Sequence, residues 1–421
     1  MTLALVVLPL ALFLLGVPIF ALLLAAASAA LVFGGLPMPA IALHQILFGG
    51  IDKYALLAVP FFVFAGELMS RGGIAQRLVD WVLALTGRLP GSLGLTTVGT
   101  ATLLGAVSGS SPATVAAVGR SLYPSLLEKG YGQRFSLGLI ASSGSIAIVV
   151  PPSIAMILYG ASAEQSIPKL FQAGLLPGLL IALALAAYIL FWSRGRALGD
   201  AGRFEFALLL AATRRAWAAL TMPVVVLAGI YLGWFSPTEA GGVACLYALL
   251  AATLLYRSLT WRQVLETAGE AALLTAQILV IVAAAGVFSW LLTVQGVPQA
   301  LVQAIVGLEL SPAAFLLLVN LALLLIGCLL DPTSAILVLT PLLIPIVRQL
   351  GLDPIHFGVV MTVNLSIGMF TPPFGLNLFV AQSVLSPDLA AIYRGILPFL
   401  AVQLLCLAAI TYLPDLSLAL L

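Results

Sequence analysis

Long apolar runs separated by short polar stretches make up most of the chain. An α-helix of about 20 apolar residues is long enough to cross the hydrocarbon core of a bilayer. Runs of that order occur from one end of the sequence to the other: residues 3–33, 170–192, 214–233, 271–292, 313–330 and 395–413. A single buried core cannot accommodate so many apolar runs of this length, so the pattern predicts an all-α polytopic membrane protein.

Composition supports this class of protein and removes others. The 421 residues are 62% hydrophobic and only 8% charged, and no basic run suggests a nucleic-acid partner. Cys245, Cys328 and Cys406 stand in apolar surroundings at spacings that match no metal site, which is typical of small core residues. The first apolar run has no basic segment before it and continues past residue 24 without a convincing cleavage site. We therefore interpret it as the first membrane span and not as a signal peptide.

The longest polar stretch, residues 193–215, lies near the middle of the chain. Arginines outnumber acidic residues in it: Arg194, Arg196, Arg203, Arg214 and Arg215, against Asp200 and Glu205. Loops rich in Lys and Arg tend to stay on the cytoplasmic side of a membrane. We therefore expect a cytoplasmic linker at this position.

The parts of the chain on either side of this linker share a series of features in the same order. At a shift of about 220 residues, with a residue or two of slippage, glycines, prolines and small polar residues coincide. The matched positions are Gly66 with Gly286, Ser111-Pro112 with Asp331-Pro332, Thr114 with Ser334, Pro151-Pro152 with Pro372-Pro373, and Gly174 and Pro177 with Gly395 and Pro398. An ordered series at one shift predicts a duplicated unit.

The charges indicate how the two copies are oriented. The first copy has basic flanks: Arg71, Arg77, Arg88, Arg120, Lys129 and Arg134, against Asp80 and Glu128. The matching flanks of the second copy are nearly neutral, with Glu309, Arg348 and Asp353. Equivalent loops would then face opposite sides of the membrane, which predicts an inverted repeat.

Each copy contains a helix start inside an apolar segment that is too short to cross the membrane twice. The start is Ser111-Pro112 within residues 95–118 and Asp331-Pro332 within residues 313–347. Ser and Asp cap helix N-termini, and a proline in the first turn loses no hydrogen bond. A helix that ends and restarts there forms a re-entrant hairpin, whose tip must face protein or a water-filled cavity.

A second break follows downstream in each copy, where paired prolines remove the helical donors of nearby carbonyls. The carbonyls affected belong to Ala147 and Ile148 before Pro151-Pro152, and to Gly368 and Met369 before Pro372-Pro373. Carbonyl and hydroxyl oxygens suit a dehydrated alkali cation, and helix N-termini at the hairpin tips suit an anion. Each segment alone could also be an ordinary part of a membrane helix or a loop cap without a binding role, because Ser, Thr, Gly and Pro are common in membrane helices. Their recurrence in order favours paired ion sites around a central anion site.

These motifs resemble those of a known family. They are G-x-x-S-G-S-S-x-A-T (105–114) with the PPS that follows it, F-S-P-T-E-A (235–240), D-P-T (331–333) and N-L-x-I-G-x-x-T-P-P-x-G (364–375). Together they are similar to the large membrane subunit of tripartite ATP-independent periplasmic (TRAP) transporters, the DctM-like proteins. The resemblance covers essentially the whole chain, and it rests on the set of motifs because SGSS alone would be weak.

The resemblance implies a Na⁺-driven importer in the bacterial inner membrane. Its partners would be a small four-helix membrane subunit, expected as a separate polypeptide, and a soluble periplasmic binding protein. Its substrate would be a small organic anion, such as a C4-dicarboxylate, sialic acid or a sugar acid. Its fold would combine a scaffold domain with an elevator-type transport domain, as in the ion transporter superfamily.

The resemblance also assigns residues by motif. It implies one sodium site formed by Ser108, Ser111, Gly144, Ala147 and Ile148, and another formed by Gly327, Thr333, Gly368 and Thr371. It implies substrate contacts from Ser110, Ser153, Asp331 and Asn364. Which oxygens serve the ion and which the anion stays open at this point.

The expected domain boundaries follow the repeat. The first repeat is 1–200, with scaffold helices at about 1–90, a hairpin and broken helix at about 91–165 and a closing helix at 170–192. After the linker at 193–215, the second repeat is 216–421, with the same parts at about 216–310, about 311–385 and 390–413. Amphipathic segments at 74–86 and 297–307 are expected to be connecting arms.

Other mechanisms fit the sequence less well. No lysine stands where a phosphate-binding loop requires one, so we expect no ATP hydrolysis. Intramembrane proteolysis, a remote alternative, needs a base or a second deep aspartate, but His44 and His356 lie near loops and Asp331 is the single deep aspartate. We therefore expect no enzymatic activity. Proton coupling competes with sodium because Glu67, Glu239 and Asp331 are ionisable within apolar segments, and a binding-protein-independent anion transporter or channel is the other alternative.

Overall fold

A computed structural model describes residues 7–33, 40–196, 198 and 205–421 of the chain. These residues form helices and connecting segments, and no β-strand occurs among them. Seven helices in the described part are long and apolar enough to cross a membrane. They are Tyr54–Arg71, Ile167–Ser193, Phe206–Tyr231, Pro237–Leu255, Trp261–Val294, Pro332–Gln349 and Leu389–Tyr412. The prediction of an all-α polytopic membrane protein is confirmed.

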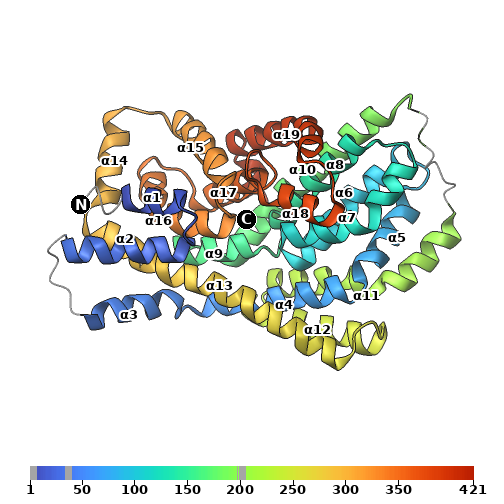
Figure 1. The fold of residues 1–421 in the computed structure, drawn as a ribbon, viewed down its shortest axis with the longest axis horizontal. Coiled ribbons are helices and arrows are strands. Elements are labelled where there is room, and N and C mark those ends of the chain that lie inside the picture. The colour runs from blue at the N-terminus through green and yellow to red at the C-terminus, as the bar shows by residue number, and fades with distance from the viewer. Residues whose placement is uncertain (1–6, 34–39, 197, 199–204) are drawn as a thin grey trace.

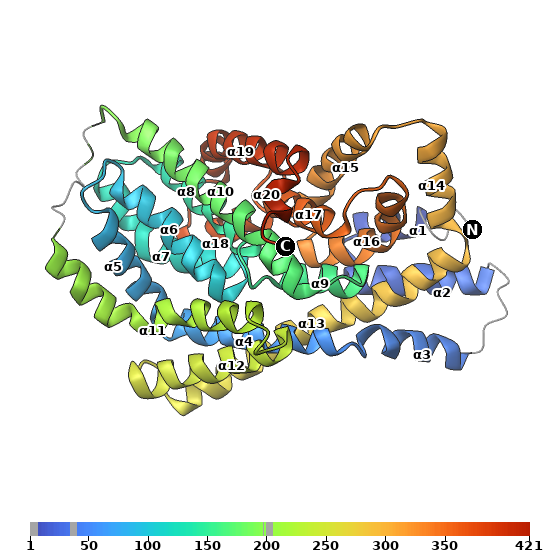
Figure 2. The same cartoon turned by 180° about the vertical axis from the view of Figure 1, so that it is seen from behind.

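The helices form two layers, which Figures 1 and 2 show from opposite sides. The outer layer, at the lower edge of both views, contains α2 (Ile19–Phe33), α3 (Ala40–Ile51), α4 (Ala58–Arg71), α11 (Phe206–Tyr231), α12 (Pro237–Leu250) and α13 (Trp261–Val294). The long helix α13 packs against α2, α3 and α4, and α12 packs against α4. Helices that are far apart in the sequence therefore form one continuous layer.

The second layer is a bundle built from both halves of the chain. The first half contributes α6 (Ser92–Ser108), α7 (Ser111–Glu128), α8 (Gln133–Gly144), α9 (Ile154–Ala163) and α10 (Ile167–Ser193). The second half contributes α15 (Pro312–Gly327), α16 (Pro332–Gln349), α17 (Pro354–Gly368), α18 (Leu376–Leu385), α19 (Leu389–Tyr412) and α20 (Asp415–Leu418). Two further helices, α5 (Ile74–Thr86) and α14 (Val297–Gly307), lie at opposite ends of the molecule and have the bounds expected for the connecting arms (Figure 1).

The two halves of the bundle pack into each other. Helix α8 of the first half packs against α19 of the second, and α17 of the second half packs against α10 of the first. In the same way α7 packs against α18, and α16 packs against α9. The sequence shift pairs α7 with α16, α8 with α17, α9 with α18 and α10 with α19, so each of these contacts occurs twice with the halves exchanged.

Polar residues at helix starts explain where many of these helices begin. Ser236 and Glu239 form a capping box at the start of α12, and Thr260 and Gln263 form another at α13. In such a box each side chain bonds a backbone N–H that the helix leaves free. Asp353 caps α17 by accepting the N–H groups of Ile355 and His356 at 2.7 and 3.0 Å.

Two stretches differ in extent from the sequence interpretation. The first apolar run contains two helices, α1 (Leu8–Leu14) and α2, because Gly16 with φ +76° and Pro18 separate them. In the expected linker at 193–215, α10 ends at Ser193 and α11 already begins at Phe206. Residues 3–6 of that run, and residues 197 and 199–204 of the linker, lie outside the described residues.

Candidate functional site

The connection between α6 and α7 is an interruption of two residues. Gly109 takes a left-handed conformation with φ +57°, in which its N–H donates to the carbonyl of Gly105 at 2.9 Å. Glycine adopts this backbone without steric cost. Ser110 is then extended, and its N–H donates to Ser108 Oγ at 3.3 Å. The predicted helix restart is confirmed, but Ser110 and not Ser111 occupies the N-cap position, and it makes no side-chain cap bond.

The connection between α15 and α16 is capped as predicted. Asp331 is extended and precedes the first residue of α16, Pro332. Its carboxylate accepts the backbone N–H of Ser334 at 3.1 Å and the Ser334 hydroxyl at 2.5 Å. A carboxylate at this position satisfies a free N–H group and interacts favourably with the helix dipole.

The first proline break follows α8 and a short 3₁₀ turn, η3 (Ser145–Ile148). The Pro151-Pro152 bond is cis, and Ser153 then caps α9 by accepting the N–H of Met156 at 3.4 Å. The Ser153 hydroxyl also donates to the carbonyl of Ile148 at 2.5 Å. The Ile148 carbonyl, expected to be free, therefore already accepts one hydrogen bond, although a carbonyl oxygen has a second lone pair.

The second proline break lies between α17 and α18 and has the same cis bond, at Pro372-Pro373. Here backbone N–H groups bond to the carbonyls whose helical donors the prolines remove. The carbonyl of Gly368 accepts the N–H of Thr371 at 3.1 Å, and that of Met369 accepts the N–H of Asn377 at 2.8 Å. The Thr371 hydroxyl donates to the preceding turn, at the carbonyl of Ile367.

Each interrupted pair of helices packs tightly against the proline break of its own half. A Cβ atom added to Gly105 would lie 2.5 Å from the Cα of Ala147, and one added to Gly368 would lie 2.5 Å from the carbonyl carbon of Gly327. The sequence shift matches Gly105 with Gly327 and Ala147 with Gly368. The same backbone contact therefore occurs in both halves, and it requires residues as small as these.

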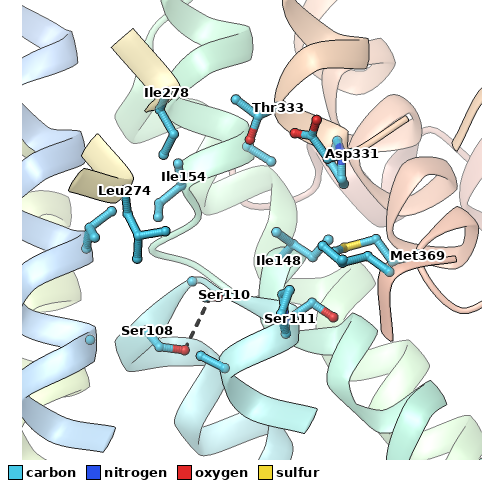
Figure 3. Close-up of a pocket in the computed structure, with 18 of the residues that line it drawn as sticks. Ser108, Ser110, Ser111, Ile148, Ile154, Leu274, Ile278, Asp331, Thr333 and Met369 are labelled. Carbon is cyan, nitrogen blue, oxygen red and sulfur yellow. Dashed lines mark hydrogen bonds between the residues drawn. The ribbon is translucent and has the colours of Figure 1, made fainter. Parts of the chain in front are cut away.

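Both connections and parts of both breaks meet at one cavity of about 190 Å³ between the bundle and the outer layer. Figure 3 shows Ser108, Ser110 and Ser111 on one side of it and Asp331 and Thr333 on the other. Helices α4 and α13 close it with Val63, Gly66, Glu67, Leu274 and Ile278. Among these described lining residues there are two carboxylates, Glu67 and Asp331, and no Lys, Arg or His.

The structure brings six of the thirteen residues suggested by the motifs to this cavity. They are Ser108, Ser110, Ser111, Ile148, Asp331 and Thr333. The others do not line it: Gly144, Ala147, Ser153, Gly327, Asn364, Gly368 and Thr371. Most of the latter lie at the proline breaks or at the glycine contacts just described.

Asn364 is buried in the bundle away from the cavity lining. Its Nδ2 donates to the backbone carbonyl and to Oδ1 of Asn320 at 2.9 and 2.8 Å. Asn320 in turn donates to Thr411 Oγ1 at 3.0 Å. These bonds connect α17, α15 and α19, so in this arrangement the Asn364 amide group holds helices together.

Two residues at the site were not assigned by the motifs. Asn377, at the start of α18, hydrogen-bonds with Ser111, and no local pattern in the sequence indicates this. Glu67 lines the cavity from α4. The sequence around Glu67 does indicate a functional role, because an ionisable residue within an apolar segment is a functional candidate by default.

Comparison with known proteins identifies the family. Residues 6–416 match the family described as "Tripartite ATP-independent periplasmic transporter, DctM component". The chain is 41% identical over 401 residues to the isethionate TRAP transporter permease protein DctMQ of Oleidesulfovibrio alaskensis, with 95% of this chain and 63% of that protein covered. It is 42% identical over 374 residues to the C4-dicarboxylate TRAP transporter large permease protein DctM of Pseudomonas aeruginosa, covering 89% and 88%.

A further relative has another substrate in its name. It is the ectoine/5-hydroxyectoine TRAP transporter large permease protein UehC of Ruegeria pomeroyi, 38% identical over 410 residues, with 97% of this chain and 95% of that protein covered. Among solved structures, the YdaH transporter of Alcanivorax borkumensis has a similar fold, with a TM-score of 0.63 at 18% identity, covering 97% and 99% of the two chains. The chain therefore belongs to the DctM component family of tripartite ATP-independent periplasmic transporters, and it is a multi-pass permease of the inner membrane.

Proposed function

We propose that this permease imports a small organic anion together with Na⁺, after a periplasmic binding protein has delivered the anion. The observation that carries the proposal is that helix connections from the two halves of the chain, at Ser110 and at Asp331, line one cavity. Two helix N-termini directed at one site give N–H groups for an anion, and the hydroxyls beside them give oxygens for a cation. We propose transport alone, without chemical catalysis.

We propose that the two halves are inverted repeats and that α6–α7 and α15–α16 are re-entrant hairpins. The exchanged packing of the halves in the bundle supports this, because the contacts of α8 with α19 and of α7 with α18 recur as those of α17 with α10 and of α16 with α9. The paired contacts of Gly105 with Ala147 and of Gly327 with Gly368 support it as well. Inverted repeats of this kind commonly place substrate and ion sites near the middle of the membrane.

The proposed Na⁺ sites lie one in each half. Ser108, Ser111, Gly144, Ala147 and Ile148 would form the first, and Gly327, Thr333, Gly368 and Thr371 the second. Their hydroxyl and carbonyl oxygens suit a hard monovalent cation. In the described part of the chain, no group of three or more His, Cys, Asp or Glu residues suggests a transition-metal site instead.

The proposed substrate contacts are Ser110 and Asp331 at the cavity, with Ser153 and Asn364 as further candidates from the family motifs. Ser110 has an extended backbone just before α7 and makes no side-chain cap bond, so its hydroxyl is available to a ligand. Relatives named for isethionate and for C4-dicarboxylate support an organic anion as substrate, while the relative named for ectoine widens the class.

We propose elevator-type movement of the bundle against the outer layer. The position of the cavity supports it, since the cavity is lined by bundle residues on two sides and by α4 and α13 of the outer layer on another. A sliding bundle would carry the cavity from one side of the membrane to the other. A small membrane subunit and a periplasmic binding protein are the proposed partners, in line with the family description.

Reconstitution into liposomes tests the function. Liposomes containing this permease and its small subunit, with the cognate binding protein outside, should accumulate succinate or isethionate only when a Na⁺ gradient is imposed. Uptake driven equally well by a proton gradient in Na⁺-free buffer would contradict sodium coupling and would direct attention to Glu67, the second carboxylate at the cavity. Flux without a binding protein would indicate a channel or an independent carrier.

A further inference from the structure

Glu67 is a carboxylate in the cavity that the proposed substrate and sodium sites do not use. It lies on α4 of the outer layer, and it lines the cavity together with residues of both helix connections. Its side chain is 25% exposed, so it is neither buried in the core nor freely solvated. Because Glu67 lines the cavity, its charge acts on any ligand held there.

The charge of Glu67 is only partly balanced. Arg71, one turn later on α4, places its Nε 4.0 Å from Glu67 Oε2, while its Nη2 hydrogen-bonds to Glu270 of α13. One guanidinium group therefore serves two carboxylates, and this group of three side chains keeps a net charge of −1. Asp331 adds a second negative charge at the cavity, and the described lining residues include no cation.

We propose that Glu67 lowers the affinity of the cavity for the organic anion and so promotes its release. This inference rests on the proposed function, in which the substrate is an anion. Repulsion between like charges is strong where little water screens them, and it grows with the charge of the ligand. The same carboxylate attracts Na⁺. A bound Na⁺ offsets part of the repulsion between Glu67 and the anion, and this compensation ends when the ion leaves.

The location of Glu67 makes the effect depend on the position of the bundle. The proposed substrate groups Ser110 and Asp331 lie on the bundle, whereas Glu67 lies on the outer layer. If the bundle slides along the outer layer, the anion moves away from Glu67 and the repulsion decreases. The affinity of the site for the anion is thus low in the arrangement described here and higher when the bundle has moved away from Glu67, as directional release requires.

Glu67 lies near the end of α4 that carries Arg71. The start of α13, with Arg262, lies on the same side, because Arg71 contacts Glu270 and Ser258 donates to the carbonyl of Gly72. Basic helix ends mark the cytoplasmic side of a membrane protein. The repulsion therefore acts near the side on which an imported anion must leave.

Equilibrium binding to the purified permease with its small subunit tests the inference. The probes are succinate (charge −2), isethionate (charge −1) and ectoine (a zwitterion), each measured by calorimetry at saturating Na⁺ and low ionic strength. Glu67→Gln should lower the Kd of isethionate by about tenfold and that of succinate by more, and should leave ectoine unchanged. Arg71→Gln should change the two anion affinities in the opposite direction.

Matched variants keep the test specific. Glu266→Gln removes the same charge from a side chain of α13 that is paired with Arg262 and does not line the cavity, so it should alter no Kd. Glu67→Asp keeps the charge and should behave like the natural protein. Glu67→Gln should also slow Na⁺-driven uptake at saturating substrate, because the anion leaves more slowly.

The outcomes separate this inference from the function on which it rests. If the natural protein binds the anions and Glu67→Gln leaves their Kd unchanged or raises it, the release role is overturned and the transport proposal stands. If neither anion binds and ectoine does, the anion proposal fails and the release role fails with it. Should Glu67→Gln not fold, the opposite shift expected for Arg71→Gln decides the question by the same comparison of succinate with isethionate.

Discussion

Ser111, at the start of α7, and Asn377, at the start of α18, are hydrogen-bonded although 266 residues separate them in the sequence. The Ser111 hydroxyl lies 3.0 Å from Asn377 Oδ1 and 2.8 Å from Nδ2, which also donates to the carbonyl of Ala141 at 3.1 Å. Both side chains are buried. The pair joins the helix connection of the first half to the proline break of the second, beside the cavity that Ser111 lines.

Removing either partner should destabilise the protein. Ser111→Ala or Asn377→Ala leaves a buried polar group without its partner, so each should lower the free energy of unfolding by about 1–3 kcal/mol. The double variant should lose less than the sum, with a coupling of about 1 kcal/mol, because the bonds between Ser111 and Asn377 are already lost in either single variant. Unfolding in detergent, followed by intrinsic fluorescence, measures this cycle.

Thr293→Ala provides the reference for the Ser111–Asn377 cycle. The Thr293 hydroxyl bonds only to the preceding turn of the exposed end of α13, at Ser289. Its effect should add to that of Asn377→Ala. Equal coupling in both cycles would argue against a specific bond between Ser111 and Asn377.

Gly368→Ala should disrupt the second half of the bundle. The new Cβ would lie 2.5–2.7 Å from the backbone of Gly327, so the two segments would have to separate, at a cost of about 1–3 kcal/mol or more. We expect a lower melting temperature and loss of Na⁺-dependent uptake. Gly269→Ala is the control, because a Cβ on this exposed part of α13 meets no atom within 4 Å; a comparable loss in both variants would exclude a local steric cause.

Variants of Asp331 should separate its capping role from its charge. Asp331→Asn keeps an acceptor for the Ser334 N–H and should change stability little, whereas Asp331→Ala removes the cap and should cost about 1 kcal/mol. If the charge also contributes to ligand binding, the Asn variant alters affinity while its melting temperature stays close to that of the natural protein. Thermal unfolding with and without Na⁺ measures both effects.

Lys53 connects the outer layer to the bundle. Its Nζ donates to the carbonyl of Ala161, at the end of α9, at 2.7 Å. Lys53→Met should loosen this contact, and we expect faster deuterium uptake at residues 54–57 and 161–165 with no change at 236–239. Lys169→Met removes the same charge from an exposed position on α10 and should leave all three segments as they were. Unchanged exchange in the Lys53 variant would show that the bond does not hold the layers together.

Much of the architecture follows from local sequence. The apolar runs determine the long helices, and α5 and α14 have the bounds that their amphipathic patterns indicate. Pairs of a polar residue and a proline mark the starts of α7 and α16, and the proline pairs mark both breaks. These features are predictable because each depends on residues within one or two helical turns.

The partners of the polar groups could not be predicted in this way. The Ile148 carbonyl accepts the Ser153 hydroxyl, Ser111 bonds to Asn377 and does not cap its helix, and Asn364 connects helices away from the cavity. Glu67 comes to the same cavity as residues more than 250 positions away.

The sequence by itself therefore determined the helices, their interruptions and the family, since propensity, capping and hydrophobic length act over short distances. Only the tertiary structure decided which oxygens face the cavity and which are used within the bundle. The reason is that hydrogen-bond satisfaction and charge balance in a buried site depend on whichever groups the packing brings together, and here those groups come from opposite halves of the chain.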